Sequence, residues 1–292
     1  GETIVSELKK HHSFSNKHIR LLCAARGGQK QPQQLNALSY FLVLGAEYDI
    51  VINLDGYNEI WLPLFNNLAN NVAAVYPRKW NLFVQNTFDE KSTMELAIQV
   101  RAKDLQLKYR RFFSRAPFRW SNFSLALWDA LDKRQESKIR DSYQAFSENV
   151  TENDGNVYGP FKAMPDTSDY VREMADYWQR SSEQMDLLGE MYGFEYYHFL
   201  QPNQYVPNTK NFTDEELKIA LGTRRDRKRV IAEGYQFFAN RGQAMRERGI
   251  AFINLAMLFA DENRTVYKDK CCHFTQLGSD IIAKKMVNEI LK

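Results

Sequence analysis

The chain has 292 residues, of which 44% are hydrophobic and 13% aromatic, enough to bury a large core. Its 39 basic and 36 acidic residues are mostly interspersed and leave a net charge of +3, so no overall field points to nucleic acid or to an anionic membrane. No window reaches the roughly eighteen uninterrupted apolar residues of a membrane span. The chain starts abruptly at Gly1, so the sequence leaves open an upstream leader or membrane anchor and does not identify the compartment.

Short apolar runs alternate with helical stretches in the first quarter of the chain. Segment 19–25 (IRLLCAA) predicts a strand, and apolar residues at three- and four-residue spacing predict a helix over 32–46. A second strand is predicted over 48–56 (YDIVINLDG) and a helix over 58–72. Such alternation is typical of a parallel sheet covered by helices.

The alternation stops from about residue 76 to 190, where aromatic and charged residues predict helices joined by a polar loop. We expect a long helical insertion here, serving as a lid, a partner surface or extra packing. A further strand is predicted over 195–202 (EYYHFLQP), and the run 249–259 fits either a strand or a helix.

The predicted fold class is a three-layer α/β/α sandwich with a mainly parallel, flavodoxin-like sheet. We expect one domain over 1–292 that contains the helical insertion. The opening residues 1–5 precede a helix and are expected to form the turn after a first strand that lies upstream.

Polar and glycine-rich segments follow three of the predicted strands. They are Arg26-Gly27-Gly28-Gln29, Gly56-Tyr57-Asn58-Glu59 and the late segment 259–286, which contains Cys271, Cys272 and His273. In open parallel sheets ligands bind at the carboxyl ends of the strands. The sequence therefore predicts a site at that edge.

The ordered segments resemble the blocks of the SGNH or GDSL hydrolase superfamily. Gly1-Glu2-Thr3 is similar to its Gly-Asp-Ser turn, and Gly28 stands for the glycine after its second strand, 30 residues before Asn58. GYNE at 56–59 is similar to its Gly-x-Asn-Asp block, with Glu for Asp, and HFTQLGSDIIAKKMVNEIL at 273–291 is similar to its histidine and final helix.

The resemblance implies ester hydrolysis by acyl transfer on short acyl esters, carbohydrate O-acyl esters or lipids. Thr3 would hold the nucleophile position, while Gly28 and Asn58 would donate to the oxyanion. His273 would be the base and Asp269 would orient it, since imidazole titrates near neutral pH. Nothing in the sequence demands a cofactor or a metal, and the sequence does not determine the oligomeric state.

Two departures from the family pattern leave alternatives open. A threonine replaces the expected serine, so a serine upstream or Ser6 could be the nucleophile instead. The family has an aspartate three residues before its histidine, but here that position is Lys270, and Asp269 lies four residues before His273. Glu262 or a backbone carbonyl could therefore orient the ring instead of Asp269. A non-catalytic relative that keeps the pocket for binding, or a partner-binding module built on the insertion, are the rival functions.

Some of these residues also have purely structural interpretations. Zinc binding by Cys271, Cys272 and His273 is not expected, because adjacent cysteines do not easily point at one tetrahedral centre, and packing is the expected role of the thiols. Asn58 could simply cap a helix. His198, inside a predicted strand, is expected to be a satisfied interior histidine.

Overall fold

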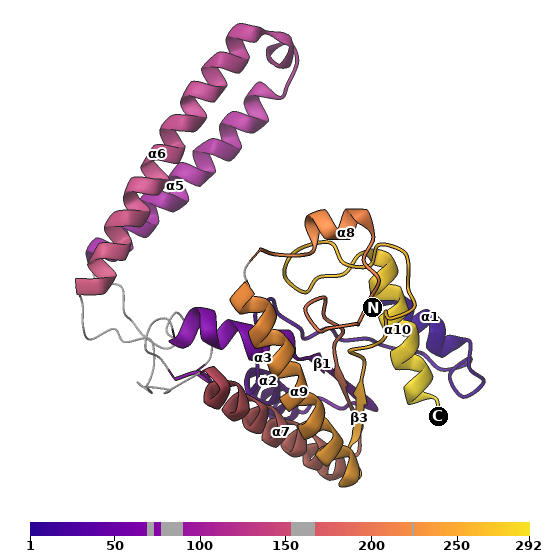
Figure 1. Cartoon of the computed structure of the whole chain (residues 1–292). Coiled ribbons are helices and arrows are strands. Elements are labelled where there is room, and N and C mark those ends of the chain that lie inside the picture. Colours follow the sequence, from indigo (N-terminus) through magenta and orange to yellow (C-terminus); the bar gives the residue numbers. More distant parts are fainter. Residues whose placement is uncertain (69–72, 77–89, 153–166, 224) are drawn as a thin grey trace. The chain divides into compact units, whose positions relative to one another are not determined.

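The computed structural model describes residues 1–68, 73–76, 90–152, 167–223 and 225–292. The fold is mixed α/β, with 59% helix and one three-stranded, all-parallel sheet packed with helices (Figure 1). The chain divides into two compact units. The first comprises Gly1–Arg78 with Pro160–Lys292, and the second comprises Lys79–Gly159.

The sheet has the strand order β1-β2-β3, with β1 over Ile50–Asp55, β2 over Glu195–Leu200 and β3 over Ala251–Asn254. The strands predicted over 48–56 and 195–202 are confirmed, and the ambiguous run 249–259 begins as a strand. Because all three are parallel, their carboxyl ends lie at one edge of the sheet.

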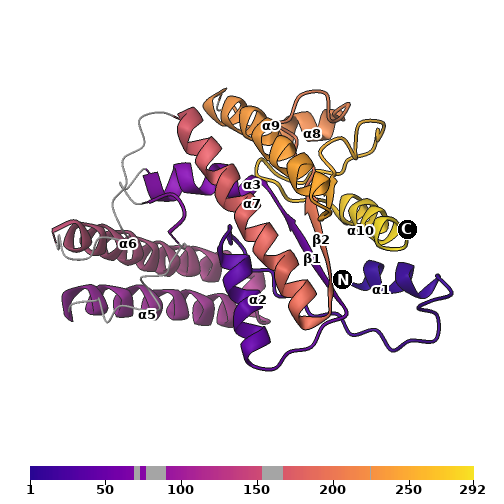
Figure 2. The same cartoon turned by 90° about the horizontal axis from the view of Figure 1, so that it is seen from below.

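Alternate residues of β2 face two different hydrophobic cores. Tyr196 and Leu200 belong to the larger core, whereas Phe199 belongs to the smaller one. The larger core packs against α2 (Gln33–Val43), α3 (Tyr57–Leu62), α7 (Thr167–Tyr192) and α9 (Arg225–Glu247). The smaller core packs against α1 (Glu2–Lys9) and α10 (Gln276–Ile290). Figure 2 shows β1 and β2 between α7 and the α1–α10 pair.

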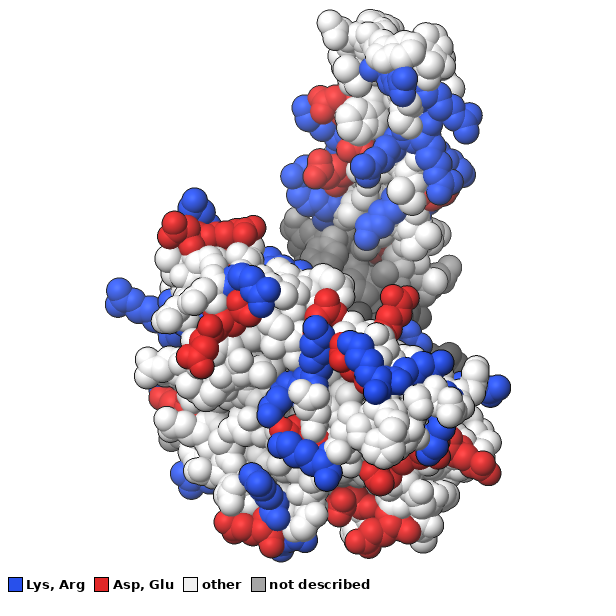
Figure 3. Space-filling view, turned by 90° about the vertical axis from the view of Figure 1, so that its right-hand side faces the viewer, with Lys and Arg blue, Asp and Glu red and all other residues white. Residues whose placement is uncertain are grey.

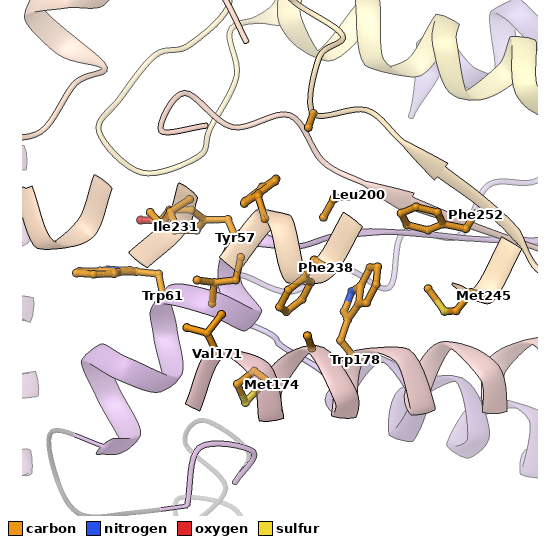
Figure 4. Packing of buried hydrophobic residues seen from close by; sticks show 14 of the residues in the cluster. Tyr57, Trp61, Val171, Met174, Trp178, Leu200, Ile231, Phe238, Met245 and Phe252 are labelled. Atoms are coloured by element: carbon orange, nitrogen blue, oxygen red, sulfur yellow. The ribbon is translucent and has the colours of Figure 1, made fainter. Parts of the chain in front are cut away.

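Helix α7, the last helix of the predicted insertion 76–190, is part of the first unit. It packs on α9 and β2 and buries Tyr170, Met174 and Trp178 in the larger core, and Figure 4 shows Trp178 beside Phe238 of α9. The second unit is a pair of antiparallel helices, α5 (Glu90–Phe113) and α6 (Asn122–Glu152), joined through a 3-10 turn at Phe118–Trp120.

The prediction of a strand over 19–25 is wrong. This segment is an exposed loop, and its apolar residues Leu21 and Leu22 stay in solvent. An apolar run becomes a strand only when a neighbouring strand satisfies its backbone N–H and C=O groups. None of the described strands pairs with it.

The predicted helix over 32–46 is confirmed as α2. The helix predicted over 58–72 begins as α3 and continues as a π-helical turn at Pro63–Asn67, while 69–72 lie outside the described residues. A short helix α8 spans Asp214–Ile219. None of the described helices is long and apolar enough to cross a membrane.

Candidate functional site

Asn58 and the loop around Gly28 lie side by side at the carboxyl edge of the sheet. The Asn58 side chain donates from Nδ2 to the Gln29 carbonyl at 2.8 Å. Gly56 begins α3 at φ 137°, where a Cβ would lie 2.6 Å from Leu200, so glycine alone fits. Gly56 is the residue that caps α3, hence the interpretation of Asn58 as a helix cap is wrong.

His273 and Asp269 form a close pair in the loop before α10. Nδ1 of His273 lies 2.6 Å from Oδ2 of Asp269, and the Cys271 N–H donates to Oδ1 at 2.8 Å. Burial raises the pKa of Asp269, but the hydrogen bonds from His273 and Cys271 outweigh burial and hold that pKa below its ordinary value. With the Nδ1 proton directed at this carboxylate, Nε2 is the basic nitrogen of the ring. The His273 side chain is 59% exposed, so a substrate can reach it.

The loop carrying this pair is anchored on α3 and its neighbours. Its Lys270 carbonyl accepts from the Tyr205 hydroxyl at 2.5 Å and from Nη1 of Arg227 at 2.8 Å. The thiol of Cys271 lies beside the buried Tyr57 hydroxyl. Because Tyr57 directly precedes Asn58, the loop and the Gly28–Asn58 pair share one edge of the sheet.

Thr3 is not brought to His273. It lies inside α1, and its hydroxyl donates to Oδ1 of Asp280 in α10 at 2.5 Å. A hydroxyl has one proton, so this bond would have to break before Thr3 could donate to a base. Ser6 lies exposed on the same helix.

Glu262, the alternative partner for His273, is engaged elsewhere. Its carboxylate accepts from the Arg264 guanidinium at 2.6 and 2.8 Å and from the Arg264 N–H at 2.9 Å. The hydrogen bonds from Arg264 lower the pKa of Glu262 to about 2. Asp269 is therefore the carboxylate that orients the ring.

Cys271 and Cys272 point toward one another, contrary to expectation. Their sulfurs are 3.7 Å apart, and the ligand atoms of Cys271, Cys272 and His273 lie within 4.8 Å of one another. The loop is irregular, and its backbone turns both side chains to one side. Among the described residues these three could hold a soft ion such as Zn²⁺, with a fourth position left open.

The two thiols also differ in acidity. A hydrogen bond from Cys272 lowers the pKa of Cys271 to about 6, whereas the same bond and burial raise the pKa of Cys272. Cys271 is thus the more acidic of the two thiols. Any assay with an activated ester has to separate its reactivity from that of His273.

A buried polar network lies beneath this edge and was not anticipated from the sequence. Asp55 at the end of β1 accepts from Nε1 of Trp178 at 2.6 Å and from Nδ2 of Asn53 at 2.8 Å, and Nε2 of His198 lies 2.9 Å from it. The other ring nitrogen of His198 lies 2.7 Å from the Ser182 hydroxyl. The prediction that His198 is a satisfied interior histidine is confirmed.

Glu59 extends the network toward the Gly28 loop. Its fully buried carboxyl group accepts from the N–H groups of Gly56 at 2.9 Å and Gln31 at 3.1 Å, and from the side chain of Gln34 at 3.1 Å. Burial, and then the negative charge of Asp55, raise the pKa of Glu59 to about 8 despite these donors. Glu59 therefore ties the glycine loop to the start of α3.

The raised pKa makes stability pH-dependent. Between about pH 5 and pH 8 native Glu59 keeps a proton that the unfolded chain has released, so the free energy of unfolding falls as pH rises through this range. Glu59→Gln is always neutral, and the fall from pH 5 to pH 8 in urea unfolding is expected to be about 1 to 3 kcal/mol smaller than in the unmodified chain. The exposed Glu47→Gln is the control; an equal fall in all three proteins would contradict the assignment.

A separate open depression of about 470 Å³ lies at the opposite edge of the sheet. It is lined by Gly193 and residues at the amino ends of β2 and β3, among them Glu195 and Ala251. None of the residues predicted for the site lines it. It is therefore distinct from the edge that holds Asn58 and His273.

Comparison with known proteins adds no relative: no family model, curated protein or solved structure matches the chain.

Proposed function

We propose that this chain forms an ester hydrolase site of the SGNH type within a three-layer, flavodoxin-like α/β/α domain. The observation that best supports the proposal is the Asp269–His273 pair, exposed at the carboxyl edge of a parallel sheet. Hydrophobic cores on both sides of the sheet and the strand order β1-β2-β3 support the layered architecture.

In this proposal His273 moves protons while Asp269 keeps the ring in one tautomer. Nε2 takes the proton of an attacking hydroxyl, the oxygen bonds to the ester carbonyl carbon, and the same proton passes to the departing alcohol. Water then releases the acyl group by the same route. The Gly28 N–H and the second N–H of the Asn58 amide would stabilise the oxyanion, each donor contributing about 3 to 4 kcal/mol.

The substrates proposed are short acyl esters, including O-acyl groups on carbohydrates. The attacking hydroxyl belongs either to Thr3, after it leaves Asp280, or to a serine upstream.

A second candidate is a catalytically impaired, ligand-binding relative. The observation that favours it is the hydrogen bond from Thr3 to Asp280, which holds the hydroxyl within α1 and away from His273. Such a protein would keep the edge formed by Asn58 and His273 but would not turn over esters.

The discriminating experiment is hydrolysis of p-nitrophenyl acetate in a Cys271→Ser background, which removes the acidic thiol. We expect turnover, raised by about tenfold or more in Thr3→Ser, since serine lacks the methyl group that restricts χ1. Thr3→Ala is the matched control: unchanged turnover would assign the nucleophile to another residue. With any residues upstream of Gly1 included in the assayed protein, no turnover in the background protein or in Thr3→Ser would contradict the hydrolase and favour the binding relative.

A further inference from the structure

The connected end of the α5–α6 hairpin, where the chain turns from one helix to the other, exposes large aromatic side chains. We call residues 108–123, which join the two helices, the hairpin tip. Trp120 is 69% and Phe123 78% exposed, and Phe112 and Phe118 are also exposed. Side chains of this size are usually buried, so their clustering at one end of a helical pair indicates a contact surface.

The hairpin tip is strongly basic. No acidic residue occurs between Asp104 and Asp129, while this interval contains five basic residues, all of them exposed: Lys108, Arg110, Arg111, Arg115 and Arg119. Lys108 pairs with Asp104 at 2.7 Å, and none of the four arginines forms an ion pair with a described carboxylate. Figure 3 shows Lys and Arg predominating over Asp and Glu in the upper part of the hairpin.

Four rings of the hairpin tip, those of Phe112, Phe113, Phe118 and Trp120, are in contact with another ring or with an arginine. Phe112 stacks on Phe118 with centroids 4.6 Å apart, and buried Phe113 packs edge-on against Phe112 at 5.2 Å. The Arg119 guanidinium lies 4.4 Å from the centroid of the Trp120 ring. Because these side chains are already ordered, binding a partner costs less side-chain conformational entropy.

Aliphatic side chains close to the hairpin tip in the sequence are also exposed. Leu107 on α5 and Leu125 and Leu127 on α6 are exposed as well. Aromatic rings and arginines would also suit a single-stranded nucleic acid, whose bases stack on them. Aliphatic side chains do not stack with bases, whereas they are stabilised by burial among lipid acyl chains, so the leucines favour a bilayer. Basic residues next to Trp and Phe are typical of segments that lie in the interface of an anionic bilayer.

We propose that the hairpin tip is a binding site for an anionic phospholipid bilayer. The four arginines contact lipid phosphates, and Trp120 and Phe123 enter the interfacial layer. The binding is independent of ester hydrolysis and uses none of the residues at the sheet edge, so each proposal can fail without the other.

Vesicle flotation of the full chain tests the site. We expect binding to vesicles of phosphatidylcholine with about 30% phosphatidylglycerol, and at least about tenfold weaker binding to pure phosphatidylcholine. Raising the salt from about 0.05 to 0.5 M should release most of the protein. Trp120→Ser with Phe123→Ser, and separately Arg111→Gln with Arg115→Gln, should each weaken binding about tenfold or more.

Matched variants on α5 keep the experiment specific. Met94→Ser with Val100→Ser removes exposed apolar groups, and Arg101→Gln with Lys103→Gln removes exposed charge, both away from the hairpin tip. These variants should bind as the unmodified chain does, with equal helicity in all proteins.

Equal losses in the tip and control variants would overturn the proposal. So would retention on heparin or single-stranded RNA without vesicle binding, or release from vesicles by about 10 mM inorganic phosphate, which would indicate a polyanion or single-anion site instead.

Discussion

Replacing Asp269 with asparagine is expected to lower kcat/KM for p-nitrophenyl acetate about 100- to 10,000-fold in the Cys271→Ser background. The asparagine oxygen can still accept from the Cys271 N–H, but an amide group facing Nδ1 of His273 favours the opposite tautomer. The proton then sits on Nε2, and the ring no longer accepts one from a hydroxyl.

A stability measurement on Asp269→Asn shows whether a loss of activity comes from the orientation of His273 or from unfolding. The side chain of Asp269 is 40% exposed, so the midpoint of urea unfolding should move little. Asp129→Asn, which removes an exposed carboxylate paired with Lys133, is the matched control and should leave kcat/KM unchanged. Full activity of Asp269→Asn would mean that this carboxylate does not orient the base.

Replacing Trp178 with alanine is expected to lower the free energy of unfolding by about 3 to 5 kcal/mol. The indole is fully buried, with its centroid 4.4 Å from that of His198 and 4.8 Å from that of Phe238. Its removal leaves a cavity and also takes away the Nε1–H that bonds Asp55 at 2.6 Å. A buried carboxylate that loses a donor adds to the cost of the cavity.

Urea unfolding followed by circular dichroism measures this loss. Trp178→Phe keeps most of the ring and should lose about 1 to 3 kcal/mol, chiefly through the missing hydrogen bond. Trp120→Ala, at an exposed position of the hairpin, should stay within about 0.5 kcal/mol of the unmodified chain. A Trp178→Ala variant as stable as Trp120→Ala would show that α7 is not part of the core.

The sheet was predictable where the sequence carries both apolar content and turn signals. The runs 48–56 and 195–202 are rich in aliphatic and aromatic residues, and their strands β1 and β2 pair in parallel. Segment 19–25 has similar composition, yet it has no hydrogen-bonded neighbour among the described strands and stays exposed. Local sequence does not encode the presence of a neighbouring strand.

The sequence suggested the candidate residues but did not determine which of them lie in contact. Asp269 stands one residue outside the family spacing, and only the path of an irregular loop decides that it reaches His273. The path of this loop also turns the sulfurs of Cys271 and Cys272 toward one another, whereas we expected adjacent cysteines to point apart.

Charged residues in the interior were the hardest features to foresee. Lys30 lies in a polar stretch of the sequence and Glu59 precedes an apolar run, and ionisable side chains of both types are typical of surfaces, yet both are fully buried. The Lys30 ammonium donates to the Ala74 and Tyr76 carbonyls at 2.6 and 2.9 Å, and burial lowers its pKa to about 8. Such burial follows from long-range contacts, which a local pattern does not specify.

A double-mutant cycle on Asp269 and His273 tests most directly whether the two act as one catalytic unit. In the Cys271→Ser background, kcat/KM for p-nitrophenyl acetate would be measured for Asp269→Asn, His273→Gln and the double variant. Because an oriented base loses its function once either member is gone, the account predicts that the double variant is no slower than His273→Gln alone. Losses that multiply, or full activity of His273→Gln, would contradict it.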